Sequence, residues 1–270
     1  MGKLRDYLRP IFRALTHIHI KKLCIKTEKE FFSYKDRFLG KSCFIVANGP
    51  SLKMSDLDFL FEHNVITFGM NRIYELYDRT KWRPTFYLSQ DPRVIRHTVN
   101  EIRKQVNTSV VFVKVPGEKK YDIPKAINYD LDYSNTVKNI PPEFYNGDNC
   151  VFADGKSVTY SAIQLAAFMG FSKIYLIGCD CNYSNDNKTI SVESYPDPRM
   201  YDSKKVGDPP DMVYTFWAYE SAKKYADEHN FEIINATRGG LLNVYKRENL
   251  DDLFRRIEQH KNEENWEELK

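Results

Sequence analysis

The stretch Lys173-Ile-Tyr-Leu-Ile-Gly178 decides the fold, because it is the strongest strand signal in the chain. A short apolar run of this kind is typical of a strand buried inside a sheet. Residues 157–169 precede it and predict a small-residue helix packed on the sheet, with Gly170 at the left-handed cap position. Further strands are predicted at residues 42–47, 65–68, 84–88, 109–113 and 231–235, and helices at residues 92–105 and 213–229. This alternation predicts an α/β fold with a doubly wound, mostly parallel sheet.

The composition of the 270 residues indicates a substantial core, since 42% are hydrophobic and 29% are charged. A net charge of +3 is too balanced for an obligate nucleic-acid binder, so no nucleic-acid partner is expected. The sequence has no apolar run of about 18 residues and no signal-peptide pattern, and we therefore expect a cytoplasmic protein. The odd number of scattered cysteines fits reduced thiols in that compartment. They are Cys24, Cys43, Cys150, Cys179 and Cys181.

Polar residues follow the first two predicted strands, and ligands of a doubly wound sheet bind beyond the carboxyl ends of the strands. Asn48, Gly49 and Ser51 follow the first strand, where Gly49 permits close backbone approach and the other two offer hydrogen bonds. This turn matches neither the P-loop nor the dinucleotide-binding pattern. Asn71 follows the second strand and could hydrogen-bond a sugar or a base edge. The next residue, Arg72, is either a phosphate ligand or a solvated residue at a helix start.

The third strand and the central helix supply further candidates. Asp91 follows the strand at residues 84–88 and precedes a proline, so it is either a helix N-cap or a catalytic carboxylate. The start of the central helix offers free amides and a positive dipole end, which favour an anion such as phosphate. Its candidate ligands are Lys156, Ser157, Val158 and Thr159.

Residues after the strongest strand complete the set. Asp180 and Tyr183 lie there and join Asp91 as candidate catalytic residues. Cys179 and Cys181 lack a second Cys or His pair nearby, so no metal site is expected at this turn.

Three segments are predicted around the sheet. Residues 1–37 form a basic, amphipathic N-terminal helical segment, and within it residues 1–26 either dock on the protein's own domain or contact an anionic membrane surface. Residues 116–149 are expected to form an irregular loop, and residues 184–212 a lid. Residues 248–270 carry eight acids and four bases and predict an acidic C-terminal helix.

Several motifs together resemble a known family. They are Ile45-Val-Ala-Asn-Gly-Pro-Ser-Leu52, Met70-Asn-Arg-Ile-Tyr74, Gly155-Lys-Ser-Val-Thr159, Met169-Gly-Phe-Ser-Lys-Ile-Tyr-Leu-Ile-Gly-Cys-Asp180 and Asn235-Ala-Thr-Arg-Gly-Gly240. Over about residues 38–255 the chain resembles the MptE-like domain of bacterial surface-polysaccharide proteins and motility-associated flagellin glycosyltransferases. It is more distantly similar to the Campylobacter-type sialyltransferases. The resemblance implies a Rossmann-like nucleotide-binding catalytic domain at residues 38–247 with a mobile lid.

The resemblance also implies roles for individual residues. Asn48, Gly49 and Ser51 match the turn that contacts the nucleotide, and Asn71 matches the residue that meets CMP. The other matches are Ser157, Val158 and Thr159 at the helix start near the nucleotide, and Tyr183, one residue later than a phosphate-contacting Tyr.

Two positions depart from the sialyltransferase pattern. Gly155 stands where those enzymes have an Arg, which leaves only Lys156 beside it as a substitute. Residues 184–228 contain no His to match the lid His that is taken as their general base. The aspartates considered there as bases are Asp186, Asp197, Asp202, Asp208 and Asp211.

The resemblance implies a glycosyltransferase of polysaccharide biosynthesis that moves a nonulosonic, sialic-acid-like sugar from a CMP-activated donor to a cell-surface glycan. No cofactor or metal is expected beyond the CMP-sugar substrate, and Asp91 or a lid aspartate is the hypothetical general base. The alternative is the archaeal branch's activity, transfer of diphosphate from ATP to a hydroxymethylpterin, in which an aspartate pair holds Mg²⁺. The pairs with suitable spacing are Asp56 with Asp58 and Asp130 with Asp132. A third hypothesis is a non-catalytic nucleotide-binding domain.

Overall fold

The computed structural model describes residues 27–106, 109–114, 123, 125–183, 191–203 and 211–261. The basic segment at residues 1–26, two parts of the predicted lid (184–190 and 204–210) and residues 262–270 lie outside this part of the chain. The predictions of a membrane contact and of lid closure therefore stay predictions. None of the helices in the described part combines the length and apolar character that a membrane crossing needs.

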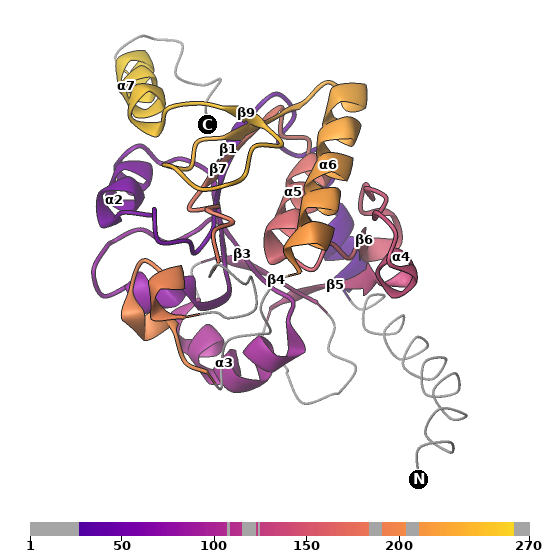
Figure 1. Cartoon of the computed structure of the whole chain (residues 1–270). Helices are drawn as coiled ribbons and strands as arrows, with labels where there is room; N and C mark the ends of the chain where they lie inside the picture. The colour runs from indigo at the N-terminus through magenta and orange to yellow at the C-terminus, as the bar shows by residue number, and fades with distance from the viewer. Residues whose placement is uncertain are drawn as a thin grey trace.

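Nine parallel strands form one sheet, which confirms the predicted α/β, Rossmann-like fold (Figure 1). The strands are β1 (Ser42–Val46), β2 (Thr67–Met70), β3 (Phe86–Ser89), β4 (Val110–Lys114), β5 (Ile127–Asp132), β6 (Val151–Ala153), β7 (Lys173–Ile177), β8 (Glu232–Asn235) and β9 (Lys246–Arg247). Their order is β6-β5-β4-β3-β2-β1-β7-β8-β9. The chain therefore winds outward from β1 in one direction and restarts from β7 in the other. The switch point between β1 and β7 is where such sheets open a crevice for ligands.

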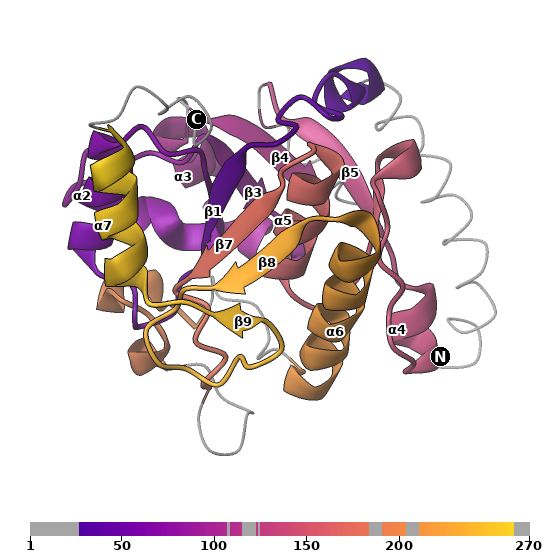
Figure 2. The same cartoon turned by 90° about the horizontal axis from the view of Figure 1, so that it is seen from above.

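Helices cover both faces of the sheet (Figure 2). They are α2 (Met54–Glu62), α3 (Pro92–Gln105), α4 (Ser134–Lys138), α5 (Val158–Phe168), α6 (Met212–His229) and α7 (Leu250–Lys261), with 3₁₀ turns η1 (Asn71–Leu76), η2 (Asp148–Cys150), η3 (Val192–Ser194) and η4 (Pro198–Met200). Along β1, Cys43 and Ile45 belong to the core under α5 and α6, whereas Phe44 and Val46 belong to the core under α2, α3 and α7. This alternation is the two-residue period of a strand buried on both faces.

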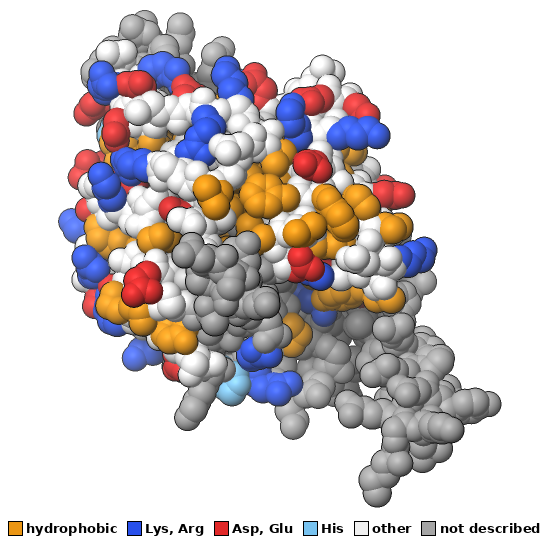
Figure 3. All heavy atoms as spheres, in the orientation of Figure 1, with side chains coloured by type: hydrophobic (Ala, Val, Ile, Leu, Met, Phe, Trp, Pro, Cys, Tyr) orange, Lys and Arg blue, Asp and Glu red, His pale blue; other side chains and the backbone are white. Residues whose placement is uncertain are grey.

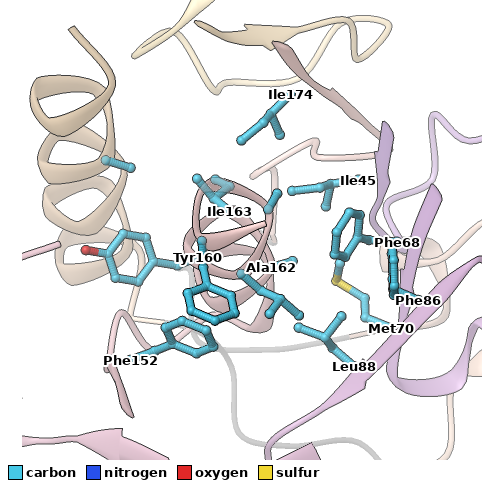
Figure 4. Close-up of a cluster of buried hydrophobic side chains, with 14 of the residues drawn as sticks. Ile45, Phe68, Met70, Phe86, Leu88, Phe152, Tyr160, Ala162, Ile163 and Ile174 are labelled. Carbon is cyan, nitrogen blue, oxygen red and sulfur yellow. The ribbon is translucent and has the colours of Figure 1, made fainter. Parts of the chain in front are cut away.

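The central helix α5 is buried almost throughout. Its side chains Ala162 and Ile163 pack toward Ile45, Phe68 and other strand residues (Figure 4). The small residues predicted to allow close packing do so here, and this holds the first turn of α5 firmly at the edge of the sheet. On the face shown in Figure 3, acidic and basic side chains are interspersed, as expected from the balanced net charge.

The prediction of an irregular loop at residues 116–149 was wrong, because β5 and α4 lie there. Strand β5 reads Ile-Asn-Tyr-Asp-Leu-Asp, and its aspartates hide the strand pattern. In the sheet, the core contains the alternate residues Ile127, Tyr129 and Leu131. The two aspartates, Asp130 and Asp132, lie at the carboxyl end of the strand. Strands β6 and β9 were also missed, since three and two residues give too short a pattern.

Candidate functional site

A cavity of about 510 Å³ opens at the carboxyl ends of the strands, across the switch point. Ten of the eleven residues predicted for the site line it. They are Asn48, Gly49, Asn71, Asp91, Lys156, Ser157, Val158, Thr159, Asp180 and Tyr183. The structure therefore brings together loops that are up to 135 residues apart in the chain, from Asn48 to Tyr183.

The remaining predicted residue, Ser51, does not line the cavity but contacts Asp180, which does. Its hydroxyl donates to Oδ2 of Asp180 over 2.8 Å, and its backbone amide points to the same oxygen at 3.5 Å. A Cβ atom on Gly49 would lie only 2.0 Å from that Oδ2, so glycine is required by the close approach. Burial raises the pKa of Asp180, and the Ser51 hydrogen bonds oppose this rise. Asp180 thus holds the Asn48–Ser51 turn in place.

Two asparagines lie side by side at the ends of β1 and β2. Asn48 donates its Nδ2 to the carbonyl of Met70 over 3.1 Å, which fixes the orientation of the amide. Its Oδ1 is buried and has no partner in the described structure, so it is available to a donor on a ligand. Asn71 adopts the left-handed conformation (φ 49°) that asparagine tolerates better than most residues. Both side chains reach the cavity wall, so the pair can hydrogen-bond one ligand group.

The first turn of α5 forms another part of the wall. Ser157 is the residue before the helix, and its hydroxyl bonds Tyr219 over 3.3 Å instead of capping the helix amides. The amides of Val158 and Thr159 belong to the first turn, where helical partners are missing, and they favour an anion. Tyr183 adds a phenol on the same wall, and burial raises its pKa. The phenol therefore stays a neutral hydrogen-bond donor.

Packing explains why no arginine stands at Gly155. A Cβ atom there would lie 2.3 Å from the Tyr160 ring and 2.8 Å from Cβ of Ala218. The adjacent Lys156 lines the cavity, but its Nζ bonds Asp211 over 2.7 Å and lies 4.9 Å from the centroid of the Tyr214 ring. In this conformation the ammonium group of Lys156 is therefore paired with Asp211, the N-cap of α6.

Two carboxylates face the cavity at its other end. Asp91 caps α3 through Oδ1, which accepts from the amides of Arg93 and Val94 at 2.7 and 3.4 Å, as predicted from the sequence. Its Oδ2 accepts no hydrogen bond within the described part of the chain. Asp154 is nearly buried, and accepts from Thr136 and from the amide of Lys156. Burial raises its pKa.

Asp154 was not selected from the sequence as a candidate residue, and a signal for it existed. It directly follows β6, so the rule that ligands bind beyond strand ends would have included it once β6 was recognised. The three-residue length of β6 hid that relation.

Arg72 is neither a phosphate ligand nor a solvated residue. It is buried and donates to the carbonyls of Met200 and Arg199 over 2.9 and 2.8 Å, and it pairs with Glu75. These bonds fix residues 198–200, part of the predicted lid, onto η1. Both sequence interpretations of Arg72 were therefore wrong, because the partner segment lies more than 120 residues away.

The lid carboxylates in the described part of the chain are engaged elsewhere. Asp197 is buried between Arg79 and Arg199, whose guanidinium groups hold its pKa well below the ordinary value. Asp211 caps α6 and pairs with Lys156. Asp202 also has an interaction partner, and Asp186 and Asp208 lie outside the described residues. Among the proposed base carboxylates that the structure describes, Asp91 is therefore the one that lines the cavity.

The two aspartate pairs considered as Mg²⁺ ligands have other interactions in the described structure. Asp56 accepts from the amide of Lys53 and from Arg238, and Asp58 accepts from Thr80 over 2.6 Å. Asp132 accepts from Tyr145 over 2.8 Å, while Asp130 is buried beside it on β5. None of these four carboxylates lines the cavity, and the described residues contain no cluster of three or more metal-ligating side chains.

Comparison with known proteins identifies the family and similar folds. A family model described as 6-hydroxymethylpterin diphosphokinase MptE-like matches residues 18–186. The chain belongs to this MptE-like family. The match confirms the resemblance seen in the sequence motifs. No curated protein matches the chain significantly.

Solved structures with this fold include the MAf glycosyltransferase of Magnetospirillum magneticum AMB-1, with a TM-score of 0.53 and 15% identity. The comparison covers 85% of this chain and 39% of that one, so the MptE-like chain spans about two fifths of the larger protein. The sialyltransferase CST-II in complex with CMP gives a TM-score of 0.42 and 15% identity, over 77% and 86% of the two chains. CstII from Campylobacter jejuni with cytidine-5'-monophosphate gives 0.36 and 13%, over 76% and 84%.

Proposed function

We propose that this MptE-like chain is a glycosyltransferase that transfers a nonulosonic, sialic-acid-like sugar from a CMP-activated donor to a glycan acceptor. The observation that carries the proposal is the convergence of the two asparagines, the start of α5 and Asp91 on one cavity. The fold neighbour with the TM-score of 0.53 is itself described as a glycosyltransferase, which agrees with the proposal. We further propose that the reaction takes place on the cytoplasmic side of the membrane.

The phosphate of CMP fits the start of α5. In the transfer, the bond between the anomeric carbon and the phosphate oxygen breaks, and CMP leaves with the electron pair. The amides of Val158 and Thr159 and the phenol of Tyr183 can stabilise the charge that develops on the phosphate. Asn48 and Asn71 can hold the nucleoside, with the free Oδ1 of Asn48 accepting a hydrogen bond from it.

Asp91 is proposed as the general base. As the acceptor oxygen forms its bond to the anomeric carbon, the hydroxyl proton passes to Oδ2 of Asp91, the oxygen that α3 does not use. The helix amides hold the other oxygen, so the carboxylate is oriented by the fold itself.

The variant Asp91→Asn tests this assignment, because asparagine caps a helix as well as aspartate does but cannot take the proton. We expect transfer from a CMP-nonulosonate to fall by about 10²–10⁴-fold. CMP binding and the unfolding temperature should stay unchanged. Asp252→Asn, in the first turn of α7, is the matched control and should retain full activity. Unchanged transfer by Asp91→Asn would exclude Asp91 as the base.

The second candidate function is the diphosphokinase activity in the family description, in which ATP donates a diphosphate group. A thermal-shift screen separates the two functions. Stabilisation by CMP that persists in EDTA supports the glycosyltransferase, whereas stabilisation only by ATP with Mg²⁺ supports the diphosphokinase. CDP, UDP and GDP serve as competing nucleotides. Nucleotide binding without turnover of any donor would point to a binding domain instead.

A further inference from the structure

The end of the cavity away from the Asn48–Ser51 turn has no ligand assigned by the proposed function. Its wall consists of Leu131 in β5 and of residues that follow β3, β5 and β6, namely Gln90, Asp91, Tyr133 and Asp154. We infer that this region, the acceptor half, binds an uncharged sugar and discriminates against anionic acceptors. The inference rests on the proposed glycosyltransferase function and adds the chemical class of the acceptor.

Gln90 gives the acceptor half an unused hydrogen-bond donor. The side chain is 8% exposed, and its Oε1 accepts from the Tyr129 hydroxyl over 3.3 Å. Its amide nitrogen forms no hydrogen bond to any described residue, although the side chain reaches the cavity wall. Because Nε2 is not among the buried atoms without a partner, it is accessible from the cavity, where a ligand can accept its hydrogen bond.

The two carboxylates on the same wall are acceptors. Asp91 keeps Oδ2 free, and Asp154 retains lone pairs beyond its bonds to Thr136 and the amide of Lys156. A hydroxyl group both donates and accepts, so the hydroxyls of one sugar ring can satisfy Gln90 and both carboxylates. An apolar ligand would leave the donor of Gln90 and the Oδ2 acceptor of Asp91 without a hydrogen bond in a partly buried site.

Tyr133 provides an apolar surface beside these groups. It is 40% exposed, which is high for a large aromatic residue, and it lines the cavity. Lys114 Nζ lies 5.4 Å from the centroid of the Tyr133 ring and fixes its environment on the inner side. An aromatic ring next to hydrogen-bonding groups matches a sugar, which has an apolar C–H face and a polar hydroxyl rim.

The charge balance decides against an anionic acceptor. Among the described residues, the carboxylates of Asp91 and Asp154 line the acceptor half, and one buried ammonium group, that of Lys114, interacts electrostatically with both. The other nearby cation, Lys156, is paired with Asp211 over 2.7 Å. Two carboxylates against one ammonium leave the described part of the acceptor half negative. In a partly buried cavity this repulsion is weakly screened by salt.

Direct binding tests the inference without requiring turnover. The probes are the methyl glycosides of glucose and galactose and the two matching methyl uronides, which differ only by oxidation at C6. Their affinities for the full chain, saturated with CMP, are measured by ligand-observed NMR. We expect at least one hexoside to bind at least about tenfold more tightly than its uronide. Asp154→Asn should narrow this gap, and Tyr133→Ala should weaken hexoside binding by about tenfold.

The control variant is Val137→Ala, on α4 close to Tyr133 in sequence but outside the cavity wall, and 65% exposed. It should leave all affinities unchanged, and CMP affinity should stay the same in every variant. Equal or tighter binding of the uronides, or no hexoside binding at all, would overturn the inference. Failure of the proposed function has a separate signature, since CMP would then neither bind nor be released from a CMP-sugar.

Discussion

The substitution Gly49→Ala gives the sharpest test of the site geometry. The new Cβ atom would lie 2.5 Å from the backbone oxygen of Gly178 and 2.0 Å from Oδ2 of Asp180. Contacts below 3.0 Å are essentially never tolerated, so the turn must move from Gly178 by at least 0.5 Å. The hydrogen bond from the Gly49 amide to the Gly178 oxygen, now 2.8 Å, would lengthen as well.

We expect overpacking and the weakened hydrogen bond to lower the free energy of unfolding by about 2–3 kcal/mol. For a chain of this size that corresponds to an unfolding temperature lower by roughly 4–12 °C. CMP affinity, measured by calorimetry, should fall by more than about tenfold because Asn48 moves with the turn. Both changes are read from one preparation.

Two controls separate the close contact from a general cost of the added methyl group. Gly40→Ala places its Cβ atom where nothing lies within 4 Å, so it carries only the cost of a positive φ of 79° and should leave CMP affinity intact. Gly49→Ala with Asp180→Ala removes the side-chain contact but keeps the one with the Gly178 backbone, and Ser51 loses its hydrogen bonds to Asp180, so recovery relative to Gly49→Ala should be partial at most. Wild-type stability and CMP affinity in Gly49→Ala would refute the described geometry.

Three further predictions concern charged residues. Arg72→Met should lower the free energy of unfolding by about 3 kcal/mol in urea titrations and expose residues 191–203 to proteolysis, because Glu75 and two carbonyls lose their buried partner. Lys156→Met should change stability by less than about 1 kcal/mol, since Lys156 and Asp211 are 32% and 43% exposed, and an undiminished CMP affinity would argue against a phosphate role for Lys156. Asp154→Asn should become more stable relative to wild type as the pH rises above 3.8. The reason is that burial raises the folded-state pKa of Asp154, so its ionisation disfavours the folded state. Urea titrations at several pH values measure the difference in unfolding free energy, and a difference that does not change with pH would contradict the prediction.

Much of the fold could be predicted because its central strands are continuously apolar. The β7 run and the small residues of α5 carry their burial in the sequence itself, and Asp91 with Pro92 marks the start of α3 unambiguously. Strands β5, β6 and β9 escaped detection because they are short or carry polar residues. Their place in the sheet depends on pairing with distant strands, and no local pattern records that pairing.

The site could be predicted in part for a related reason. Polar residues directly after apolar strands are visible in the sequence, and the sheet order then brings Asn48, Asn71 and Asp180 to one cavity. Partnerships across the fold are not visible in this way. The interactions of Arg72 with residues 199–200 and of Asp197 with Arg79 join segments more than 110 residues apart, so the roles of these residues could only come from the structure.

The packing at Gly155 bears on the chemistry of the proposed reaction. With no room for a side chain there, the described donors that would meet the proposed phosphate are the amides of Val158 and Thr159 and the phenol of Tyr183, none of which carries a formal charge. Neutral donors suit the single phosphate of CMP better than the triphosphate of ATP, whose larger charge calls for cations. Lys156 could add a positive charge only by leaving Asp211. The uncharged donors at the start of α5 thus support the proposed CMP-dependent reaction.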